Sequence, residues 1–451
     1  MDRDSTTTTI TPDLPKVPPG SSSMVWRLHV VKCPDPAHAG RVVRMPMAPW
    51  TVGRKAAGLQ LDDPALSRDQ LLVHPDLSGV WLRDLDSRNG TWAGGQPVRQ
   101  ARLGDGAVVR LGGTVLVLEA DAGTALQYAD PTPNLPGRTE RARLTRFDVA
   151  LAAEQPLHVL LVGETGTGKE HAAAEIHRLS RRTGPIVRMN VAAVPSELFE
   201  SELFGHVAGA FTGATAARMG RVREANHGTL VLDEIGDLPA HLQPKLLRVL
   251  EENLVRPVGG SADLRVDVRF VASTNADLET LVREGRFRRD LLARLRSNTV
   301  HLTPLRDRRA DVLEFADVVL PLVDGRPPKM WADRLTTEAA EAVLLHNWLD
   351  NLRSLRGALS RARALAGRDP VGLEHLPDDL IRKVAVARPE ATLTPTEARR
   401  PPPAHLRDAL RRHHGRVEAL AHEFGVHRRQ VYRWLTYAGI GADEIEGFRA
   451  G

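Results

Sequence analysis

The sequence predicts a multidomain protein, with an all-β domain at the N-terminus, a central α/β domain followed by a helical subdomain, and an all-α domain at the C-terminus. The first observation is length, because 451 residues are enough for about three domains of ordinary size. The second is the spacing of apolar residues, which changes from short runs between turns to alternating strands and helices, and then to helical spacing alone. The third is a pair of proline-containing stretches that separate these regions as linkers.

The composition indicates a globular protein. Apolar residues make up 42% and charged residues 26% of the chain, and no apolar run approaches the roughly 18 residues of a membrane span. Residues 1–24 lack the apolar centre of a secretory signal, so we expect a disordered lead there. The single cysteine, Cys33, excludes an intramolecular disulfide framework and suits a reducing compartment. We therefore expect a cytoplasmic protein with no membrane partner.

Residues 25–121 are predicted to form a small β sandwich, because short apolar runs alternate with the turn signals PDPAHAG, DSRNGT and LGDG. The region resembles a forkhead-associated (FHA) domain, a reader of phosphothreonine, at the positions Gly53, Arg54, Ser67, Arg68, Asn89, Gly90 and Thr91. Gln70 stands where that family usually has His. The resemblance implies that a phosphopeptide is bound by Arg54, Ser67, Arg68, Arg88 and Asn89. The alternative is a sandwich with surface arginines that binds nothing phosphorylated.

A linker at residues 122–136 precedes an α/β domain at 137–306. There the stretch GETGTGKE follows an apolar strand and opens a helical stretch, which is the context of a phosphate-binding loop. Glycines let backbone N–H groups converge on phosphate oxygens, and the lysine supplies a charge for the β and γ phosphates. We expect ATP to be bound by Gly163, Glu164, Thr165, Gly166, Thr167, Gly168, Lys169 and Glu170. A glycine-rich turn without a ligand is the alternative.

The stretch GTLVLDEIGDLP places two acids at the end of a buried strand, Asp233 and Glu234. An acid in this position can hold Mg²⁺, and a second acid can polarise the water that attacks a phosphate. The alternative is a strand that ends in solvated acids. Together with the phosphate-binding loop, the pair predicts hydrolysis of Mg·ATP, with Asp233 at the metal and Glu234 at the water.

Between these two stretches lies the signature GAFTGA, flanked by ELFGH. With it, the segments from roughly residue 135 to residue 380 resemble the AAA+ domain of bacterial enhancer-binding proteins, the activators of sigma-54 RNA polymerase. The resemblance implies a surface loop that contacts sigma-54 through Gly209, Ala210, Phe211, Thr212, Gly213 and Ala214. Glycines at both ends supply hinges, and an exposed aromatic side chain makes a contact at little entropic cost.

Further positions carry over from the same resemblance. Arg288 and Arg294 lie in a segment similar to the family's arginine-finger segment and would reach the nucleotide of a neighbouring subunit. Asn275 matches a sensor position after a strand, and Asn190 matches the residue that switches the catalytic Glu. The two asparagines could instead be ordinary strand-end caps, and the arginines could be solvated charges. The family resemblance implies a homo-oligomeric ring, a hexamer.

Residues 307–384 show helical spacing of apolar residues and are expected to form the helical lid of the AAA+ domain. The stretch NWLDNLRSLRGAL departs from the family's usual Trp-Pro-Gly-Asn-Val-Arg-Glu-Leu, because Leu349 and Asp350 replace Pro and Gly. Arg353 is the expected second sensor and nucleotide contact. Pro and Gly fix a tight entry to a helix, so their replacement predicts a shift of Arg353 and slower or differently regulated hydrolysis.

The C-terminal part consists of a second linker at 385–403, a basic helical module at 404–441 and a tail at 442–451. The sequence of this module predicts a helix, a turn and a second helix, and it resembles the Fis-type helix-turn-helix that ends many enhancer-binding proteins. The start of the second helix would place in the major groove of DNA the side chains of Arg428, Arg429, Gln430, Tyr432 and Arg433. A basic helical pair with no DNA ligand is the alternative.

These observations predict a cytoplasmic transcription activator in which a phosphothreonine-binding domain controls a ring-forming ATPase. Its expected partners are sigma-54 polymerase, upstream enhancer DNA and a phosphothreonine-containing protein or Ser/Thr kinase, and its expected cofactors are ATP and Mg²⁺. The competing hypothesis is a phosphopeptide-binding, DNA-bound scaffold or repressor whose AAA+ domain binds nucleotide without productive cycling. The intact GAFTGA loop favours the activator, and the altered second-sensor segment favours the scaffold.

Overall fold

The computed structural model describes residues 24–121, 132, 134–320, 330–385 and 403–413, together with 417, 419–420, 431, 434–435, 438 and 440. The chain divides into two compact units, Met1–Ala387 and Arg388–Gly451. Within the described part of the chain, no helix is both long enough and apolar enough to cross a membrane.

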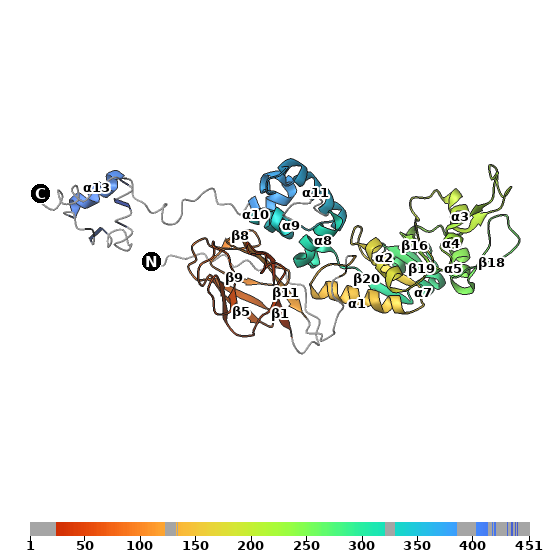
Figure 1. Ribbon diagram of the computed structural model, residues 1–451, viewed down its shortest axis with the longest axis horizontal. Helices are drawn as coiled ribbons and strands as arrows, with labels where there is room; N and C mark the ends of the chain where they lie inside the picture. Colours follow the sequence, from red (N-terminus) through yellow and green to blue (C-terminus); the bar gives the residue numbers. More distant parts are fainter. Residues whose placement is uncertain are drawn as a thin grey trace. The chain divides into compact units, whose positions relative to one another are not determined.

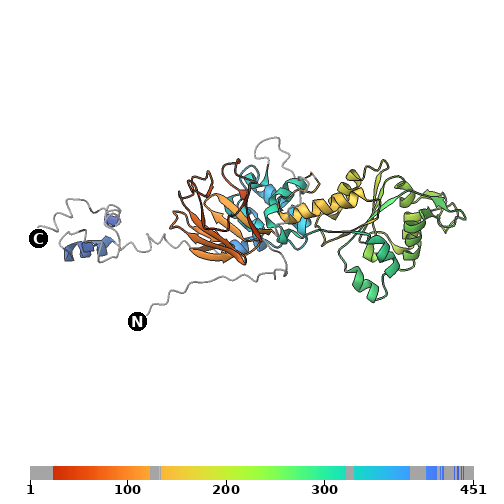
Figure 2. The ribbon, with the colours of Figure 1, turned by 90° about the horizontal axis from the view of Figure 1, so that it is seen from below.

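The N-terminal part of the first unit is a sandwich of two sheets, seen edge-on in Figure 2. One sheet has the order β2-β1-β11-β10-β7-β8, and the other has the order β4-β3-β5-β6-β9. The strands are β1 Val25–Lys32, β2 Val42–Arg44, β3 Trp50–Gly53, β4 Leu59–Gln60, β5 Leu71–Asp76, β6 Gly79–Asp84, β7 Thr91–Ala93, β8 Gln96–Val98, β9 Gln100–Leu103, β10 Val108–Leu111 and β11 Thr114–Asp121. Alternate residues such as Leu71 and Val73 point inward and build one apolar core. The predicted all-β domain is confirmed.

The central domain is built on a five-stranded sheet of order β13-β16-β19-β12-β20, in which every neighbouring pair is parallel. The strands are β12 Val159–Val162, β13 Ile186–Asn190, β16 Thr229–Asp233, β19 Arg269–Thr274 and β20 Asn298–His301. Apolar residues on both faces of each strand explain the buried parallel sheet, because Leu230 and Leu232 enter one core cluster and Val231 enters the other. The predicted α/β domain is confirmed.

Helices cover both faces of this sheet. On one face α1 (Glu140–Glu154) and α2 (Lys169–Leu179) lie side by side (Figure 1). The other face packs against α3 Ser196–Phe204, α4 Arg221–Glu224, α5 Gln243–Glu252, α6 Leu278–Arg283 and α7 Arg289–Leu295. Two short hairpins extend from this side, β14 (Gly205–His206) with β15 (Arg218–Met219) and β17 (Leu254–Val255) with β18 (Leu264–Arg265). Leu135, which the sequence boundaries place in the linker, packs in the core beneath α1.

A helical subdomain, the lid, follows the sheet and forms one bundle (Figure 1). Its α-helices are α8 Val312–Val319, α9 Trp331–Arg334, α10 Thr337–Leu345, α11 Asn351–Ala366 and α12 Asp378–Ala385. The single-turn 3-10 helix η1 Ile235–Asp237 follows β16 in the α/β domain. The single-turn 3-10 helices that follow β20 along the chain are η2 Leu305–Asp307, η3 Arg309–Asp311 and η4 Leu373–His375. Trp331 and Trp348 are fully buried at the centre of the bundle. The second unit contains α13 (Pro403–Arg412) and a small apolar cluster that includes Leu406 and Trp434.

One half-buried acid in the lid, Asp317, makes the free energy of unfolding depend on pH. Burial raises the pKa of Asp317 to about 7, and the nearby carboxylates of Glu314 and Asp333 add to this effect. The folded state therefore binds the proton of the Asp317 carboxyl more tightly than the unfolded chain does. The stabilisation that the protonated carboxyl gives to the folded state is lost as the pH rises from about 4 to about 7.

We expect Asp317→Asn, which keeps the acceptor for the Trp331 N–H, to raise the free energy of unfolding at pH 8 by on the order of 1 kcal/mol and to leave it nearly unchanged at pH 4. Urea unfolding at both pH values measures the difference. The exposed Asp369→Asn serves as the control. A gain for Asp317→Asn that is equal at both pH values would contradict this explanation.

Candidate functional site

The phosphate-binding loop connects the end of β12 to the start of α2. Gly166 and Gly168 have φ angles of 75° and 102°, a region that side chains with a Cβ rarely adopt. The side chain of Lys169 folds back over the loop, and its Nζ donates to the carbonyl oxygens of Gly163 (2.8 Å) and Glu164 (3.2 Å). The loop therefore has the curled shape and the inward-pointing ammonium group that a chain of phosphates requires.

Asp233 and Glu234 stand beside this loop because β16 lies next to β19, which in turn lies next to β12. The Glu234 carboxylate lies 4.0 Å from Nζ of Lys169, and the Asp233 carboxylate accepts a hydrogen bond from the hydroxyl of Ser273 at 2.6 Å. Glu234 has a left-handed backbone, with φ of 56°, which is uncommon outside glycine and turns its side chain away from the strand. Burial lowers the pKa of Lys169, and the two acids oppose that shift.

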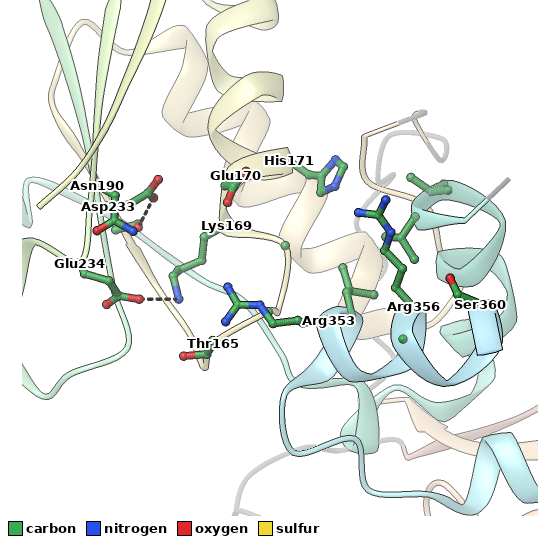
Figure 3. Close-up of a pocket in the computed structure, with 17 residues that line it drawn as sticks. Thr165, Lys169, Glu170, His171, Asn190, Asp233, Glu234, Arg353, Arg356 and Ser360 are labelled. Carbon is green, nitrogen blue, oxygen red and sulfur yellow. Dashed lines mark hydrogen bonds and ion pairs between the residues drawn. The ribbon is translucent and has the colours of Figure 1, made fainter. Parts of the chain in front are cut away.

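The two asparagines lie at the same edge of the sheet. The side-chain amide of Asn275 donates to the hydroxyl of Thr165 at 3.0 Å, and its backbone N–H donates to the Glu234 carboxylate at 3.2 Å. Asn190 ends β13 beside Asp233 (Figure 3), and its side-chain Oδ1 accepts from the N–H of Ala193 at 3.2 Å. Asn275 is thus linked to both the loop and Glu234, whereas Asn190 faces the same cavity.

The lid closes the site from the other side. The N–H of Leu352 donates to the Gly166 carbonyl at 2.9 Å, and the amide of Asn351 donates to Thr165 O (3.0 Å) and to the Glu164 carboxylate (3.2 Å). A Cβ on Gly166 would lie 2.2 Å from the carbonyl oxygen of Asp350, so the approach of the two backbones requires glycine. Arg353 lines the cavity although Pro and Gly are replaced. Asp350 itself has a negative φ (φ −98°, ψ 20°), whereas the nearby Trp348 and Asn351 have left-handed backbones with φ angles of 47° and 49°.

Three groups at the site were not predicted from the sequence. Arg306 holds the Glu164 carboxylate in a two-armed ion pair, which lowers the pKa of that carboxyl. Arg356 and Ser360 lie one and two turns after Arg353 on the same face of α11 and also line the cavity. The spacing of three and then four residues along Arg353, Arg356 and Ser360 could have suggested a shared helix face, but only the fold shows which face meets the loop.

Together these residues surround a cavity of about 610 Å³ (Figure 3). Backbone N–H groups, Lys169, Arg353 and Arg356 bring positive charge to it, as a polyphosphate requires. Glu170 and the two acids after β16 supply carboxylate oxygens, the ligands that suit Mg²⁺. The residues present therefore fit a magnesium nucleotide.

The two candidate arginine fingers lie elsewhere on the surface. Arg288 is exposed and forms an ion pair with Asp290 at 2.7 Å, and Arg294 donates to the carbonyl of Leu250 at 3.4 Å. Among the described residues that line the cavity, neither arginine is present. A single chain therefore does not bring them to its own nucleotide site.

The GAFTGA loop rises from the β14–β15 hairpin. Gly209 and Gly213 have φ angles of 80° and 97°, and a Cβ on either would meet no atom within 4 Å, so these glycines serve the backbone conformation rather than packing. Phe211 is 41% exposed, and its ring stands against the His206 ring with centroids 5.0 Å apart. Thr212 is exposed beside it, whereas Ala214 is buried. The loop thus presents an aromatic side chain to solvent.

The candidate phosphopeptide residues come from three loops of the sandwich that lie together, β3–β4, β4–β5 and β6–β7. The N–H of Arg88 donates to the Ser67 hydroxyl at 3.0 Å, and the Asn89 amide donates to the Ala65 carbonyl at 2.7 Å. Arg54 and Arg68 are exposed beside them. Backbone hydrogen bonds join the loop that carries Arg54 to the loop that carries Arg68. Lys55, which the sequence analysis did not select, is an exposed neighbour of Arg54.

Gln70 supports this arrangement in place of the family's His. It is fully buried, its Oε1 accepts from the Ser67 N–H at 3.0 Å, and its Nε2 donates to the Gly90 carbonyl at 2.9 Å. One amide therefore ties the two loops together. The candidate DNA-contacting residues, in contrast, lie outside the described residues: Arg428, Arg429, Gln430, Tyr432 and Arg433.

Comparison with known protein families gives two matches. Residues 135–301 match the Sigma-54 interaction domain, and residues 50–112 match the FHA domain. The first match contains the phosphate-binding loop, the GAFTGA loop, the acids after β16 and both candidate fingers. The second contains every candidate phosphopeptide residue.

Curated relatives carry the same central domain. The alginate biosynthesis transcriptional regulatory protein AlgB of Pseudomonas putida is 45% identical over 223 residues, 49% of each chain. The regulatory protein AtoC of Escherichia coli is 38% identical over 308 residues, 66% of each chain. The chain thus spans about half the length of the first of these relatives and about two thirds of the second.

A crystal structure of NtrX from Brucella abortus is similar to this fold, with 30% identity, a TM-score of 0.50 and coverage of 68% of this chain and 69% of that one. The chain therefore belongs to the sigma-54 activator family that carries this interaction domain, and it combines that domain with an FHA domain.

Proposed function

We propose that the protein is a sigma-54-dependent transcription activator that hydrolyses ATP to remodel the closed polymerase–promoter complex, under the control of phosphothreonine recognition by its FHA domain. The observation that carries the proposal is the combination of two features in one domain. One is a cavity with the groups that ATP hydrolysis needs, and the other is a glycine-hinged loop that exposes Phe211.

Each residue of the cavity has a role that its position supports. Lys169 and the loop N–H groups hold the β and γ phosphates, while Asp233 and Glu170 supply oxygen ligands for the metal. Bound Mg²⁺ would neutralise the charge that develops on the phosphates. Glu234 orients water, and its link to Asn275 ties it to the loop that holds the phosphates. Asn190, at the neighbouring strand end, contacts the same region, and Arg353 carries the state of the nucleotide to the lid.

Arg288 and Arg294 act in trans in this scheme. Because both are remote from the cavity of their own chain, they can stabilise the transition state only in a neighbouring subunit. Assembly into a ring, a hexamer in this proposal, would therefore be required for turnover. Movement of the loop that carries Phe211 and Thr212 then transmits the cycle to sigma-54.

The remaining partners follow from the flanking domains. The basic C-terminal module would bind enhancer DNA, and the FHA loops would bind a phosphothreonine protein or a Ser/Thr kinase. The cytoplasm is where all of these partners would meet.

Open-complex formation tests the proposal. Sigma-54 polymerase on a pre-melted promoter is mixed with the full chain and either ATP or a non-hydrolysable analogue. We expect open complexes with ATP alone. If the assembled protein forms none under either condition, the remodelling function is wrong, and the DNA-bound phosphopeptide scaffold takes its place.

Phosphopeptide binding gives a separate prediction for the FHA domain. We expect Arg54→Ala to weaken binding to a degenerate phosphothreonine peptide library by at least about 10-fold, because a charge-assisted bond to phosphate contributes roughly 1.5–3 kcal/mol. Fluorescence anisotropy measures the affinity, and Arg102→Ala, on the far strand β9, serves as the control. If the parent protein and Arg54→Ala bind the peptides with equal affinity, Arg54 does not contact the phosphate.

A further inference from the structure

The FHA sandwich contacts the lid through β1, β10 and β11, which belong to the six-stranded sheet and not to the sheet formed by β4, β3, β5, β6 and β9. We propose that this face of the FHA domain is a second interaction surface, whose partner is the lid of its own chain and whose docking sets the position of the lid over the nucleotide cavity.

A buried ion pair stands at the centre of this contact. Glu341 on α10 is 0% exposed, and its carboxylate accepts hydrogen bonds from two groups of the FHA domain: Nε of Arg110 at 2.7 Å and the N–H of Gly95 at 3.2 Å. The Arg110 guanidinium also lies over the Trp92 ring, 4.3 Å from its centroid. Burial raises the pKa of Glu341, and Arg110 opposes that shift. While the two domains stay docked, removal of Arg110 would leave the Glu341 charge buried and uncompensated, which is strongly destabilising, so this pair couples the lid to the FHA domain.

Apolar packing continues across the same contact. Val108, Val115 and Val117 are 0–1% exposed, and they pack in the core cluster of the lid rather than in the core of the sandwich. Their strand neighbours Val109, Leu116 and Leu118 face the opposite way, into the sandwich. Strands β10 and β11 therefore have two buried faces, one for each domain, which is unusual for the outer sheet of an independent sandwich.

Polar groups from both domains surround this core. Nζ of Lys32 donates to the Ala332 carbonyl at 2.6 Å, and burial lowers the pKa of this amine. A guanidinium N–H of Arg309 donates to the Gly106 carbonyl at 3.1 Å. At the start of α1, the N–H of Glu140 donates at 2.6 Å to the carboxylate of Glu119 on β11. The FHA domain is thereby fixed to the lid and to the first helix of the ATPase domain.

The surface is connected to the phosphopeptide loops by one buried acid. The Asp63 carboxylate accepts from Ala65 N–H (2.9 Å), in the loop that Asn89 also holds, and from Gly113 N–H (2.8 Å) in the β10–β11 turn. The carbonyl of Gly113 in turn accepts from the hydroxyl of Thr337, at the start of α10, at 3.4 Å. A continuous series of hydrogen bonds therefore links the loop of Ser67 to the lid helix that carries Glu341.

The lid helices at the end of this series of hydrogen bonds also position residues of the nucleotide cavity. Helices α8, α10 and α11 share one apolar core, and α11 brings Arg353 and Arg356 into the cavity. A change in FHA docking therefore changes the position of two cavity-lining cations. Because coupling between sites is reciprocal, nucleotide and FHA docking must influence each other. Only the extension of this coupling to phosphopeptide rests on the function proposed above.

Hydrogen exchange of the full chain tests the docking. We expect Arg110→Ala and Glu341→Gln to speed amide exchange in β10, β11 and α10 by about 10-fold, whereas Arg102→Ala, which breaks an FHA ion pair outside this surface, leaves these segments unchanged. Combining the two interface changes should add little to either alone, because both remove one interaction. Lys32→Met keeps the apolar part of the side chain and removes only the hydrogen bond at the edge of the contact. It therefore still tests the docking if the ion-pair variants fail to fold. If the amides of β10, β11 and α10 exchange at the rate of the parent protein in every interface variant, the proposed docking surface is wrong.

Binding of a fluorescent ADP analogue tests the coupling. We expect Arg110→Ala to change its affinity by at least about 5-fold relative to Arg102→Ala, the lower end of the usual range of coupling between sites. Equal affinities, combined with faster exchange, would overturn the control of the lid by docking. Neither measurement needs polymerase, DNA or a phosphopeptide, so failure of the activator function and failure of this inference give different results.

Discussion

Glu234→Gln is expected to lower the rate of ATP turnover by about 10²- to 10⁴-fold and to leave nucleotide binding nearly intact, the range attributed to a positioned base. The carboxylate stands 4.0 Å from Nζ of Lys169 and accepts from the backbone of Asn275, so it faces the place where the terminal phosphate would lie. Gln has the same shape but cannot accept a proton from water. The change therefore removes chemistry without removing the contacts that hold the site.

Turnover is measured by phosphate release at protein concentrations that allow assembly, and binding is measured with a fluorescent ADP analogue. Glu251→Gln, an exposed position at the end of α5, makes the same chemical change outside the cavity and should keep parental turnover. If Glu234→Gln turns over ATP as fast as Glu251→Gln, another group activates the water. Loss of binding in Glu234→Gln would indicate that the carboxylate has a structural role.

Phe211→Ala is expected to abolish open-complex formation, with a loss of at least about 30-fold, as for the central aromatic contact of an interface. ATP turnover should persist, because the ring lies on the hairpin loop and contacts His206 rather than any cavity residue. The separation of the two activities is the specific result, since a general folding defect would reduce both.

Leu198→Ala is the matched control for this experiment. Leu198 lies on α3, is 50% exposed and is apolar, yet it is outside the GAFTGA loop. We expect it to support open complexes at the parental level. If Phe211→Ala remodels polymerase as well as Leu198→Ala does, the loop is not the contact with sigma-54.

The sequence was a reliable guide wherever a function is carried by consecutive residues. Gly166 and Gly168 of the phosphate-binding loop and the two glycines of GAFTGA have left-handed backbones that few other residues adopt, so their spacing is visible in the chain itself. Asp233 and Glu234 could be selected because a strand that ends in acids has a recognisable pattern. The three fold classes were predicted correctly for the same reason, since periodicities of two and of about 3.6 residues are local properties.

The effect of substitutions between distant loops was not visible in the sequence. The replacement of Pro and Gly before Arg353 predicts a shift of this sensor, and only the structure shows that Arg353 still lines the cavity and that the neighbouring Asn351 binds the phosphate loop. Gln70 bridges two loops whose spatial proximity depends on the whole sandwich. In both cases the partner of the altered residue lies far along the chain.

What the sequence by itself determined was the order of the domains, the conformation of the glycine-dependent loops and the chemical groups available to the nucleotide site, because each depends on neighbours in the chain. The tertiary structure alone decided that Arg306 pairs with Glu164, that Arg288 is remote from its own cavity, and that Glu341 of the lid is buried against Arg110 of the FHA domain. These facts depend on surfaces that meet only after folding. A buried charge shows no sign in the sequence of the partner that will neutralise it, because burial is a property of the packed domains.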